Sequence, residues 1–376
     1  VCDSYSKKLI RDQFIKNYKI LETGQNPELN IGLQYADFSE WQRNLAANIK
    51  EDQEIYWRRK AGHPLQALEL PIDHARKLIH EYKADQIIGR IDAKLFEELG
   101  SVAKKLNCSK EKVCLAVFKL LMTRMSGLEE INIGTSLINR KDDELKNTVG
   151  PIANLVLLSD DYNLECDFCG FLDKTIKTYE DARANGDIPF DQLVNYLNPA
   201  KDMSRTALFD ILFIYEKEDD TRLDGFTEIE NNLGWGKYDY NLLLKEDGKE
   251  ITYFLTYNSL YYDRPTAERL MKCYFKLMAE VIADPHKSIE KYDYCIDSDK
   301  EKLLGAYRTL KKTGYNNLSI PEAIHMQVEK MKDKIAVTDR NKAYSYSGLD
   351  SISNRIAMYL VDNGIKEKNV VAVAVE

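Results

Sequence analysis

The feature of this sequence that most constrains its fold is an irregular alternation of helical and strand patterns. Apolar residues recur at helical spacing over 6–21, 109–125 and 189–197, whereas 208–215 and 251–257 have strand-like patterns. Asp263-Arg-Pro-Thr then predicts the start of another long helix. Strands separated by helices of unequal length favour layered α/β lobes over a repeat protein or a helical bundle.

A length of 376 residues suggests two or three domains, and charged, polar sequence over 297–317 indicates one boundary. Beyond it, Ser319-Ile-Pro-Glu322 is a capping box that opens a new helix. A further helix is predicted over about 347–364, with these apolar residues facing inward: Leu349, Ile352, Ile356, Tyr359 and Leu360.

Both ends of the sequence predict a segment of a longer protein. The chain opens on an apolar Val-Cys pair close to a helix, and 370–375 is an apolar run typical of a strand buried on both faces. Such a strand needs neighbouring strands, which the sequence does not go on to supply. We therefore expect both terminal domains to be truncated.

Composition argues against several function classes. The net charge is −8 and the basic residues are interleaved with acids, which disfavours a nucleic-acid surface. No apolar run reaches the roughly 18 residues that a membrane-spanning helix needs. Seven irregularly spaced cysteines indicate reduced thiols of a cytoplasmic protein rather than a disulfide framework. Cys166-Asp-Phe-Cys169 is a single CxxC without a second ligand pair nearby in the sequence, so no metal site is predicted.

Four segments carry recognisable motifs in a consistent order. They are Gln34-Tyr-Ala-Asp-Phe-Ser-Glu-Trp-Gln-Arg43, Val149-Gly-Pro-Ile-Ala-Asn154, Asp187-Ile-Pro-Phe190 and Lys201-Asp-Met-Ser-Arg-Thr-Ala-Leu208. The sequence resembles condensation domains of nonribosomal peptide synthetases, which carry YxDFxxW, (I/V)GxFVN and RDxSRNPL motifs in these places. Lys237-Tyr-Asp239 and Tyr257-Asn258 also have counterparts there. The departures are Pro151, Ile152, Ala153, Lys201, Thr206 and Ala207.

The C-terminal part is similar to the start of an adenylation domain. Ser319 to Val328 resembles its opening helix, and Tyr344-Ser-Tyr-Ser-Gly-Leu349 resembles the motif L(T/S)YxEL, with Gly348 in place of Glu. The resemblance implies a condensation domain over 1–300, truncated at its N-terminus, with 1–50 ending the first lobe and 51–300 forming mainly the second. A linker over 301–318 and a truncated adenylation domain over 319–376 would follow.

The implied fold class is α/β, with two-layer mixed-sheet lobes of the chloramphenicol-acetyltransferase-like type, followed by the beginning of an α/β adenylate-forming domain. The implied reaction joins a carrier-bound acyl or peptidyl thioester to a carrier-bound aminoacyl amine. No cofactor would bind directly, since 4'-phosphopantetheine is carried by the partner domains. ATP and Mg²⁺ are implied only for the complete adenylation domain. The expected partners are the upstream and downstream peptidyl carrier domains and the rest of the adenylation domain.

The family's catalytic motif is HHxxxDG, and Asp3 in Asp-Ser-Tyr-Ser fits its aspartate, with Ser4 replacing the glycine. The two histidines would then lie two and three positions upstream of Val1, so the chain alone is expected to be inactive. The resemblance implies that Asp3 is structural and pairs with a buried arginine, for which Arg140 is the candidate. Alternatively, Asp3 caps the helix over 6–21 and Arg140 is a surface side chain.

Other candidate residues have two interpretations each. Asn154 either lines the substrate channel or satisfies backbone groups at the start of a strand. Ser204 and Arg205 are predicted to tie a loop to the following strand. Tyr35, Asp37 and Trp41 are predicted to act in packing and capping.

Two alternative functions remain open at this point. One is an epimerization-type domain of the same fold, which the adenylation-like sequence downstream disfavours. The other is a non-catalytic scaffold that docks carrier domains, which the departures at Ser4, Lys201 and Gly348 leave open.

Overall fold

The computed structural model describes residues 2–28, 32–47, 51–60, 65–162, 165–197, 199, 201–217, 234–308, 318–338, 342–366 and 369–373. The chain divides into two compact units, Val1–Ile296 and Asp297–Glu376. Among the described residues, no helix combines the length and the apolar character that crossing a membrane requires.

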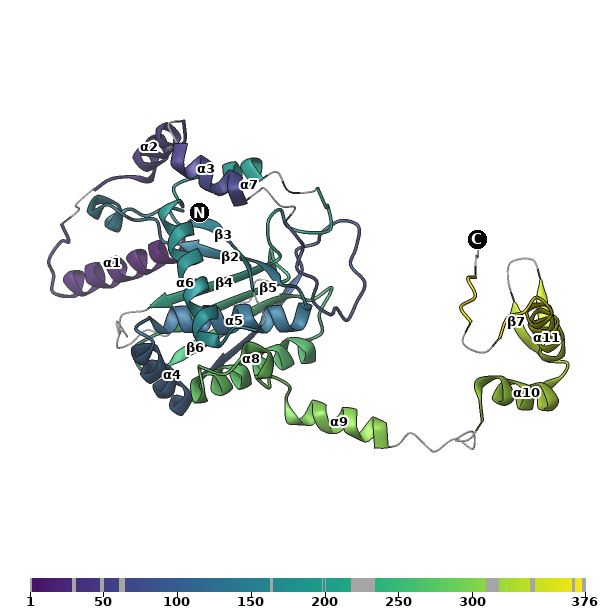
Figure 1. The fold of residues 1–376 in the computed structure, drawn as a ribbon. Helices are drawn as coiled ribbons and strands as arrows, with labels where there is room; N and C mark the ends of the chain where they lie inside the picture. The colour runs from purple at the N-terminus through teal and green to yellow at the C-terminus, as the bar shows by residue number, and fades with distance from the viewer. Residues whose placement is uncertain are drawn as a thin grey trace. The chain divides into compact units, whose positions relative to one another are not determined.

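The first unit is built on a six-stranded mixed sheet in the order β1-β6-β5-β4-β2-β3 (Figure 1). The strands are β1 (Ala84–Arg90), β2 (Glu130–Leu137), β3 (Asn154–Asp161), β4 (Ile211–Lys217), β5 (Tyr240–Glu246) and β6 (Ile251–Asn258). The pairs β2–β4 and β4–β5 are parallel, and the other neighbours are antiparallel. This mixed sheet agrees with the predicted fold class.

Four helices cover one face of this sheet: α4 (Ala93–Lys105), α5 (Lys110–Ser126), α6 (Phe168–Ala184) and α8 (Arg264–Ala283). Helix α5 contacts the other three and β2, and residues 112–123 are buried on every side. Its ends follow local signals, as predicted. Ser109 Oγ accepts from the backbone N–H of Lys112, and Gly127 ends the helix in the left-handed region at φ 69°.

The remaining helices of the first unit are α1 (Ser4–Glu22), α2 (Tyr35–Ala47), α3 (Glu51–Lys60) and α7 (Phe190–Leu197), with short 3₁₀ helices η1 (Asp143–Asn147) and η2 (Ile289–Lys291). Helix α3 packs on α7, and Trp57 donates from Nε1 to the carbonyl of Asn185 over 2.9 Å.

Helix α1 forms where it was predicted, but it does not bury its apolar stripe. The side chains of Ile10, Phe14, Tyr18 and Leu21 are all more than 40% exposed. Its buried residues are Ser6 and Ile15, and Ser6 Oγ fixes the first turn to the unit by donating to the Gly150 carbonyl.

Most predicted elements of the first unit are observed. Helices over 109–125 and 189–197 and the strand over 251–257 match α5, α7 and β6 to within one residue at each end. Strand β4 begins at Ile211 rather than at 208. The preceding residues instead form a turn in which the backbone N–H of Thr206 donates to Asp210 Oδ1 over 3.0 Å.

The second unit comprises α9 (Asp297–Arg308), α10 (Ile320–Met331), a hairpin of β7 (Ile335–Thr338) and β8 (Ala343–Ser345), and α11 (Tyr346–Asp362). The predicted capping box is present, since Ser319 Oγ accepts from the Glu322 N–H and Glu322 Oε2 accepts from the Ser319 N–H. The predicted linker begins inside α9, and 309–317 lie outside the described residues.

Two burial predictions for the second unit are wrong. Of the five residues predicted to face inward in α11, Leu349, Ile352 and Leu360 are half-buried, but Ile356 and Tyr359 are 56% and 68% exposed. The main described contacts of α11 are with α10, β7 and β8, which leave none of its residues fully buried. The apolar run from Val370 is not a strand over its described part, 370–373, and Val370 is 96% exposed. Strands β7 and β8 pair only with each other in the described chain, so no neighbour covers this run. Residues 374 and 375 lie outside the described residues.

Candidate active-site scaffold

The carboxylate of Asp3 is the centre of a buried cluster that joins the start of α1 to the segment before β3. Arg140 Nη1 donates to Asp3 Oδ2 over 2.8 Å, and Arg140 Nη2 donates to Asp3 Oδ1 over 3.1 Å. The side chains of Arg140 and Asp3 are 1% and 8% exposed, respectively. The predicted contact between these residues is therefore present as a two-point pair, which fixes orientation as well as distance.

Three backbone N–H groups complete the coordination of the carboxylate. Those of Ile152 and Ala153 donate to Oδ2 over 3.0 and 2.9 Å, and that of Ser6 donates to Oδ1 over 2.8 Å. The alternative interpretation of Asp3 as a helix cap is thus also correct, because the Ser6 contact is the N-cap bond of α1. Arg140 is not the surface side chain of that alternative.

Ser6 and Gly150 connect the pair to the (I/V)G-like motif. Ser6 Oγ donates to the Gly150 carbonyl over 2.8 Å and accepts from the Gly150 N–H over 2.9 Å. Arg140 Nη2 also donates to Ser6 Oγ over 2.9 Å. A Cβ at position 150 would lie 2.3 Å from the ring of Tyr35, so glycine is required there for close approach to α2.

Electrostatics keep Asp3 ionised. Burial by itself would raise the pKa of Asp3, but hydrogen bonds from Arg140, Ser6 and Ala153 outweigh it and lower this pKa to about 2. Arg140 also lies over the ring of Tyr5, with its guanidinium carbon 4.4 Å from the ring centre. The cluster therefore contains a permanent ion pair at neutral pH.

The low pKa of Asp3 makes this contact sensitive to acid. The pKa rises from about 2 in the folded protein to 3.8 in the unfolded chain, so the stabilisation is complete above pH 3.8 and is lost as pH falls through 2. Between about pH 5 and pH 2, the parent protein should lose about 2 kcal/mol more unfolding free energy than Asp3→Asn. Urea titrations monitored by tryptophan fluorescence measure this, because Trp41, Trp57 and Trp235 all lie in the first unit. Parallel pH profiles for the two proteins would contradict the prediction.

Asn154 occupies the first position of β3 and is buried. Its Nδ2 donates to the carbonyls of Gly186 and Ile188 over 3.0 and 2.6 Å. These bonds match the structural interpretation of Asn154, in which it satisfies backbone groups at a strand start. Contact with substrate stays a prediction.

A second buried ionic network surrounds the turn before β4. Arg205 Nη1 donates to Asp210 Oδ2 over 2.8 Å, which ties the loop to the following strand as predicted. Nearby, Arg76 pairs with Asp239, and the backbone N–H of Asp239 donates to the Asp210 carbonyl over 2.8 Å. Burial raises the pKa of Asp239 despite its contact with Arg76. Asp210 and Asp239 directly precede β4 and β5, so the paired arginines and this backbone bond hold the starts of the two strands together.

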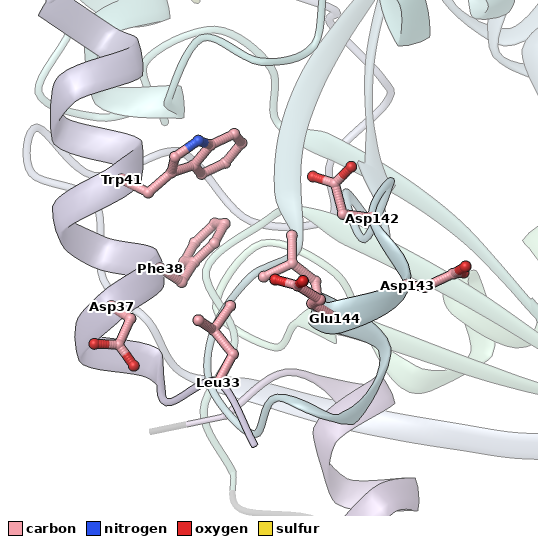
Figure 2. Close-up of a pocket in the computed structure, with 8 residues that line it drawn as sticks. Leu33, Asp37, Phe38, Trp41, Asp142, Asp143 and Glu144 are labelled. Carbon is pink, nitrogen blue, oxygen red and sulfur yellow. The ribbon is translucent and has the colours of Figure 1, made fainter.

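A pocket of about 520 Å³ lies between α2 and the segment over 142–145 (Figure 2). Its lining residues are Leu33, Asp37, Phe38, Trp41, Asp142, Asp143, Glu144 and Leu145. The carboxylates of Asp142 and Glu144 point toward the aromatic side chains, whereas those of Asp37 and Asp143 point away. Two carboxylates that face the pocket disfavour an anionic ligand.

Phe38 and Leu145 of this pocket also form a small apolar cluster with Ile152. The N–H of Ile152 also donates to Asp3, so the pocket and the ion pair share one backbone segment. The packing role predicted for the α2 motif is observed at Tyr35, and Asp37 Oδ2 accepts from the Gln34 N–H over 3.0 Å. Trp41 is instead 46% exposed at the pocket.

Sequence reasoning missed one group of side chains. Asp167 and Cys169 lie beside His286, which is 117 residues further along the chain than Cys169. The CxxC spacing drew attention to Cys169, but only the folded chain brings the histidine to it.

Solved structures share the fold of this chain. The X-domain from teicoplanin biosynthesis matches 78% of this chain and 69% of its own, with a TM-score of 0.69 and 23% identity. A holo four-domain nonribosomal peptide synthetase bound to AMP and glycine matches 97% of this chain and 29% of its own, with a TM-score of 0.70 and 19% identity. These neighbours place the chain in the chloramphenicol-acetyltransferase-like fold class.

Sequence comparison adds the family. Gramicidin S synthase 2 of Brevibacillus brevis is 26% identical over 381 aligned positions, which cover all of this chain and 8% of that protein. The chain therefore spans a small part of this relative. The family model described as the condensation domain matches residues 1–304, which is most of the sequence. The chain belongs to the condensation-domain family.

Proposed function

We propose that this chain is part of an elongation module of a nonribosomal peptide synthetase. Its condensation domain joins a carrier-bound acyl or peptidyl thioester to a carrier-bound aminoacyl amine. The observation that carries the proposal is the buried two-point pair of Asp3 and Arg140, at the place of the acidic residue of the HHxxxDG motif. The synthetase relative and the family match over residues 1–304 support it.

In this reaction the attacking amine loses a proton while an oxyanion develops on the carbonyl oxygen of the thioester. The carbon–sulfur bond then breaks, and the carrier thiol leaves with a proton. A histidine with a pKa near neutrality suits the task of accepting this proton or of holding the amine in line. Asp3 does not suit it, because its pKa is about 2 and five donors already occupy its oxygens. Asp3 and Arg140 are therefore positioning residues that hold the backbone of 150–153 against the start of α1.

The two histidines of the motif are assigned to the second and third positions upstream of Val1, so the chain as it stands would not catalyse the reaction. Asn154 is assigned to the channel wall only through its place in the (I/V)G-like motif. Residues 319–376 are assigned to the beginning of an adenylation domain. The structural match to the four-domain synthetase covers 97% of this chain, which supports this order of domains.

The complete adenylation domain would use ATP and Mg²⁺. The partners would be the upstream and downstream carrier domains with their 4'-phosphopantetheine arms, in a cytoplasmic enzyme.

The test uses the parent synthetase with both neighbouring carrier domains loaded. Mass spectrometry of the downstream carrier should detect the amide product. Alanine in place of the motif's second histidine, assigned two positions upstream of Val1, should lower the rate of amide formation by about 10²–10⁴-fold. Lys141→Ala is the matched control, because its exposed side chain pairs only with Asp187 in the described chain and its loss should leave the rate unchanged. Absence of product from loaded carriers would contradict the proposal.

A second candidate is a non-catalytic scaffold that docks carriers or other partners. It is favoured by the structure of the teicoplanin X-domain in complex with OxyB, which has a TM-score of 0.69 to this chain, and by Ser4 in place of the motif's glycine. The same assay separates the two candidates. A scaffold would bind the loaded carriers without forming product, and residues other than histidine would be encoded upstream of Val1.

A further inference from the structure

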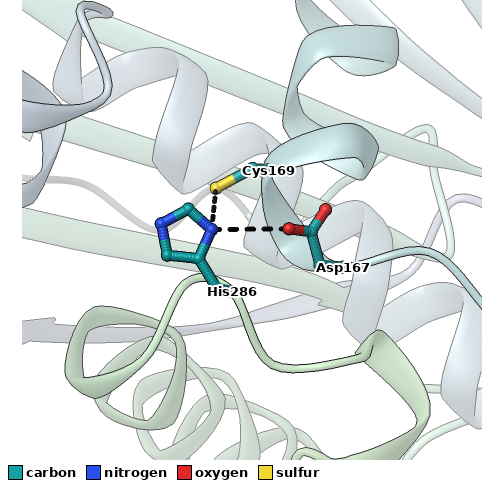
Figure 3. A group of neighbouring side chains, drawn as sticks. All are labelled: Asp167, Cys169 and His286. Carbon is teal, nitrogen blue, oxygen red and sulfur yellow. Dashed lines mark hydrogen bonds and ion pairs between the residues drawn. The ribbon is translucent and has the colours of Figure 1, made fainter.

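Three side chains with different potential metal-binding atoms meet at the start of helix α6 (Figure 3). Asp167 is the N-cap residue of α6, and Cys169 lies in its first turn. His286 comes from the loop that follows α8. Their ligand atoms all lie within 4.8 Å of one another.

The distances within this group fit a single small cation. His286 Nδ1 lies 3.6 Å from Cys169 Sγ and 3.5 Å from Asp167 Oδ2. A tetrahedral ion with bonds of about 2.0–2.3 Å keeps its ligand atoms roughly 3.3–3.7 Å apart. Both separations already fall in this range, and the third, between Cys169 Sγ and the Asp167 carboxylate, is no more than 4.8 Å. The three atoms can therefore be brought around one ion.

The backbone around the group is held in place by other contacts. Asp167 and Ser288 form an antiparallel bridge, which joins the start of α6 to the loop that carries the histidine. Asp167 Oδ1 accepts from the Gly170 N–H over 2.9 Å, which leaves Oδ2 facing His286. The backbone N–H of His286 donates to Asp284 Oδ1 over 3.1 Å. Such anchoring reduces the ordering that binding requires.

The charges around the group suit a divalent cation. The carboxylate of Asp167 belongs to the group, and those of Asp173 and Asp284 lie close enough to Cys169 to act on it electrostatically. A divalent ion would offset these carboxylates and displace the thiol proton. The resulting thiolate would also be favoured by the N-terminal end of α6. One carboxylate and one thiolate then balance the two charges of the ion.

We propose that Asp167, Cys169 and His286 bind a zinc ion that links the start of α6 to the loop after α8. The sulfur and nitrogen ligands select a borderline-soft ion such as Zn²⁺ over Mg²⁺ or Ca²⁺, which prefer oxygen. Three protein ligands leave the fourth position for water. His286 is 75% exposed at its side chain, so the ion has direct access from solvent.

Titration of the full, metal-free chain with Co²⁺ and then Zn²⁺ tests the proposal. One equivalent of Co²⁺ should produce a thiolate-to-cobalt charge-transfer absorption, which Zn²⁺ should abolish by displacement. Cys169→Ser should remove this absorption, and His286→Ala and Asp167→Asn should each weaken binding by more than about tenfold. Asp167→Asn preserves the helix cap, because asparagine is an equally good N-cap residue, so its effect reports on ligation.

Two other cysteines provide matched controls. Cys166→Ser alters the other thiol of the CxxC pair, and Cys295→Ser alters an exposed thiol elsewhere; both variants should bind Co²⁺ like the parent. Zn²⁺ should raise the melting temperature of the parent and of both controls, and should leave that of Cys169→Ser unchanged. Absence of the charge-transfer absorption in the parent, or its persistence in Cys169→Ser, would overturn the proposal.

Discussion

Replacing Arg140 with alanine is expected to lower the unfolding free energy of the first unit by about 3–5 kcal/mol. The substitution leaves the carboxylate of Asp3, which is 8% exposed, without its opposite charge. It also removes one of the two donors to Ser6 Oγ, and the guanidinium that donates to the Thr148 carbonyl. Urea titration monitored by tryptophan fluorescence measures the loss, since every tryptophan lies in this unit.

The adjacent residue provides the control for this substitution. Lys141 pairs with Asp187, but its side chain is 54% exposed, so Lys141→Ala should cost no more than about 1 kcal/mol. Arg140→Lys keeps the charge and loses the planar fork, so it should fall between the two. Equal stability of Arg140→Ala and Lys141→Ala would contradict a buried, organising pair. In the parent synthetase, Arg140→Ala should also slow amide formation, because the Thr148 and Gly150 carbonyls would lose their link through the guanidinium to the start of α1.

Signals confined to a few neighbouring residues predicted the ends of several elements correctly. Ser109 and Gly127 bound α5, and the Ser319 capping box opens α10. These signals succeed because a cap is made by atoms within three or four residues of the helix end, so the sequence contains both partners.

Asp3 and Arg140 are 137 residues apart in the sequence, and no local pattern specifies their contact. It was predicted only through resemblance to a family with a known motif order. The contact of Cys169 with His286 spans 117 residues and has no such motif, so it was not predicted. Long-range polar contacts depend on the fold as a whole, and periodicity does not reveal them.

Burial was predicted least well. The pattern in α5 indicated one apolar face, but the helix is enclosed by the sheet and three helices, and even Lys119 has no exposed surface. In the second unit burial was overestimated, because apolar residues such as Ile356 were predicted to face inward and are exposed. An apolar pattern states which residues can be buried, and the neighbouring elements decide which are.

The second substitution with a large expected effect on stability is at Asp160, which pairs with the fully buried Lys119. The side chain of Asp160 is only 1% exposed. Tyr162 donates to Asp160 Oδ2 over 2.8 Å, and Thr178 donates to Oδ1. Burial lowers the pKa of Lys119, and the Asp160 charge offsets part of this shift. Asp160→Ala should therefore lower the unfolding free energy by about 3–5 kcal/mol, because it leaves an ammonium group in the core without a counter-charge.

Two measurements connect this loss to Lys119 itself. The double variant Lys119→Met/Asp160→Ala should be more stable than Asp160→Ala by at least about 1 kcal/mol, since methionine fills the space without a charge. The deficit of Asp160→Ala relative to the parent should also shrink as pH rises from about 6 to about 9. An unpartnered buried lysine has a folded-state pKa far below its unfolded value, so its cost falls by up to about 1.4 kcal/mol per pH unit. A deficit that is constant with pH, together with no recovery in the double variant, would mean that the loss comes from Thr178 and Tyr162 rather than from the buried ammonium group.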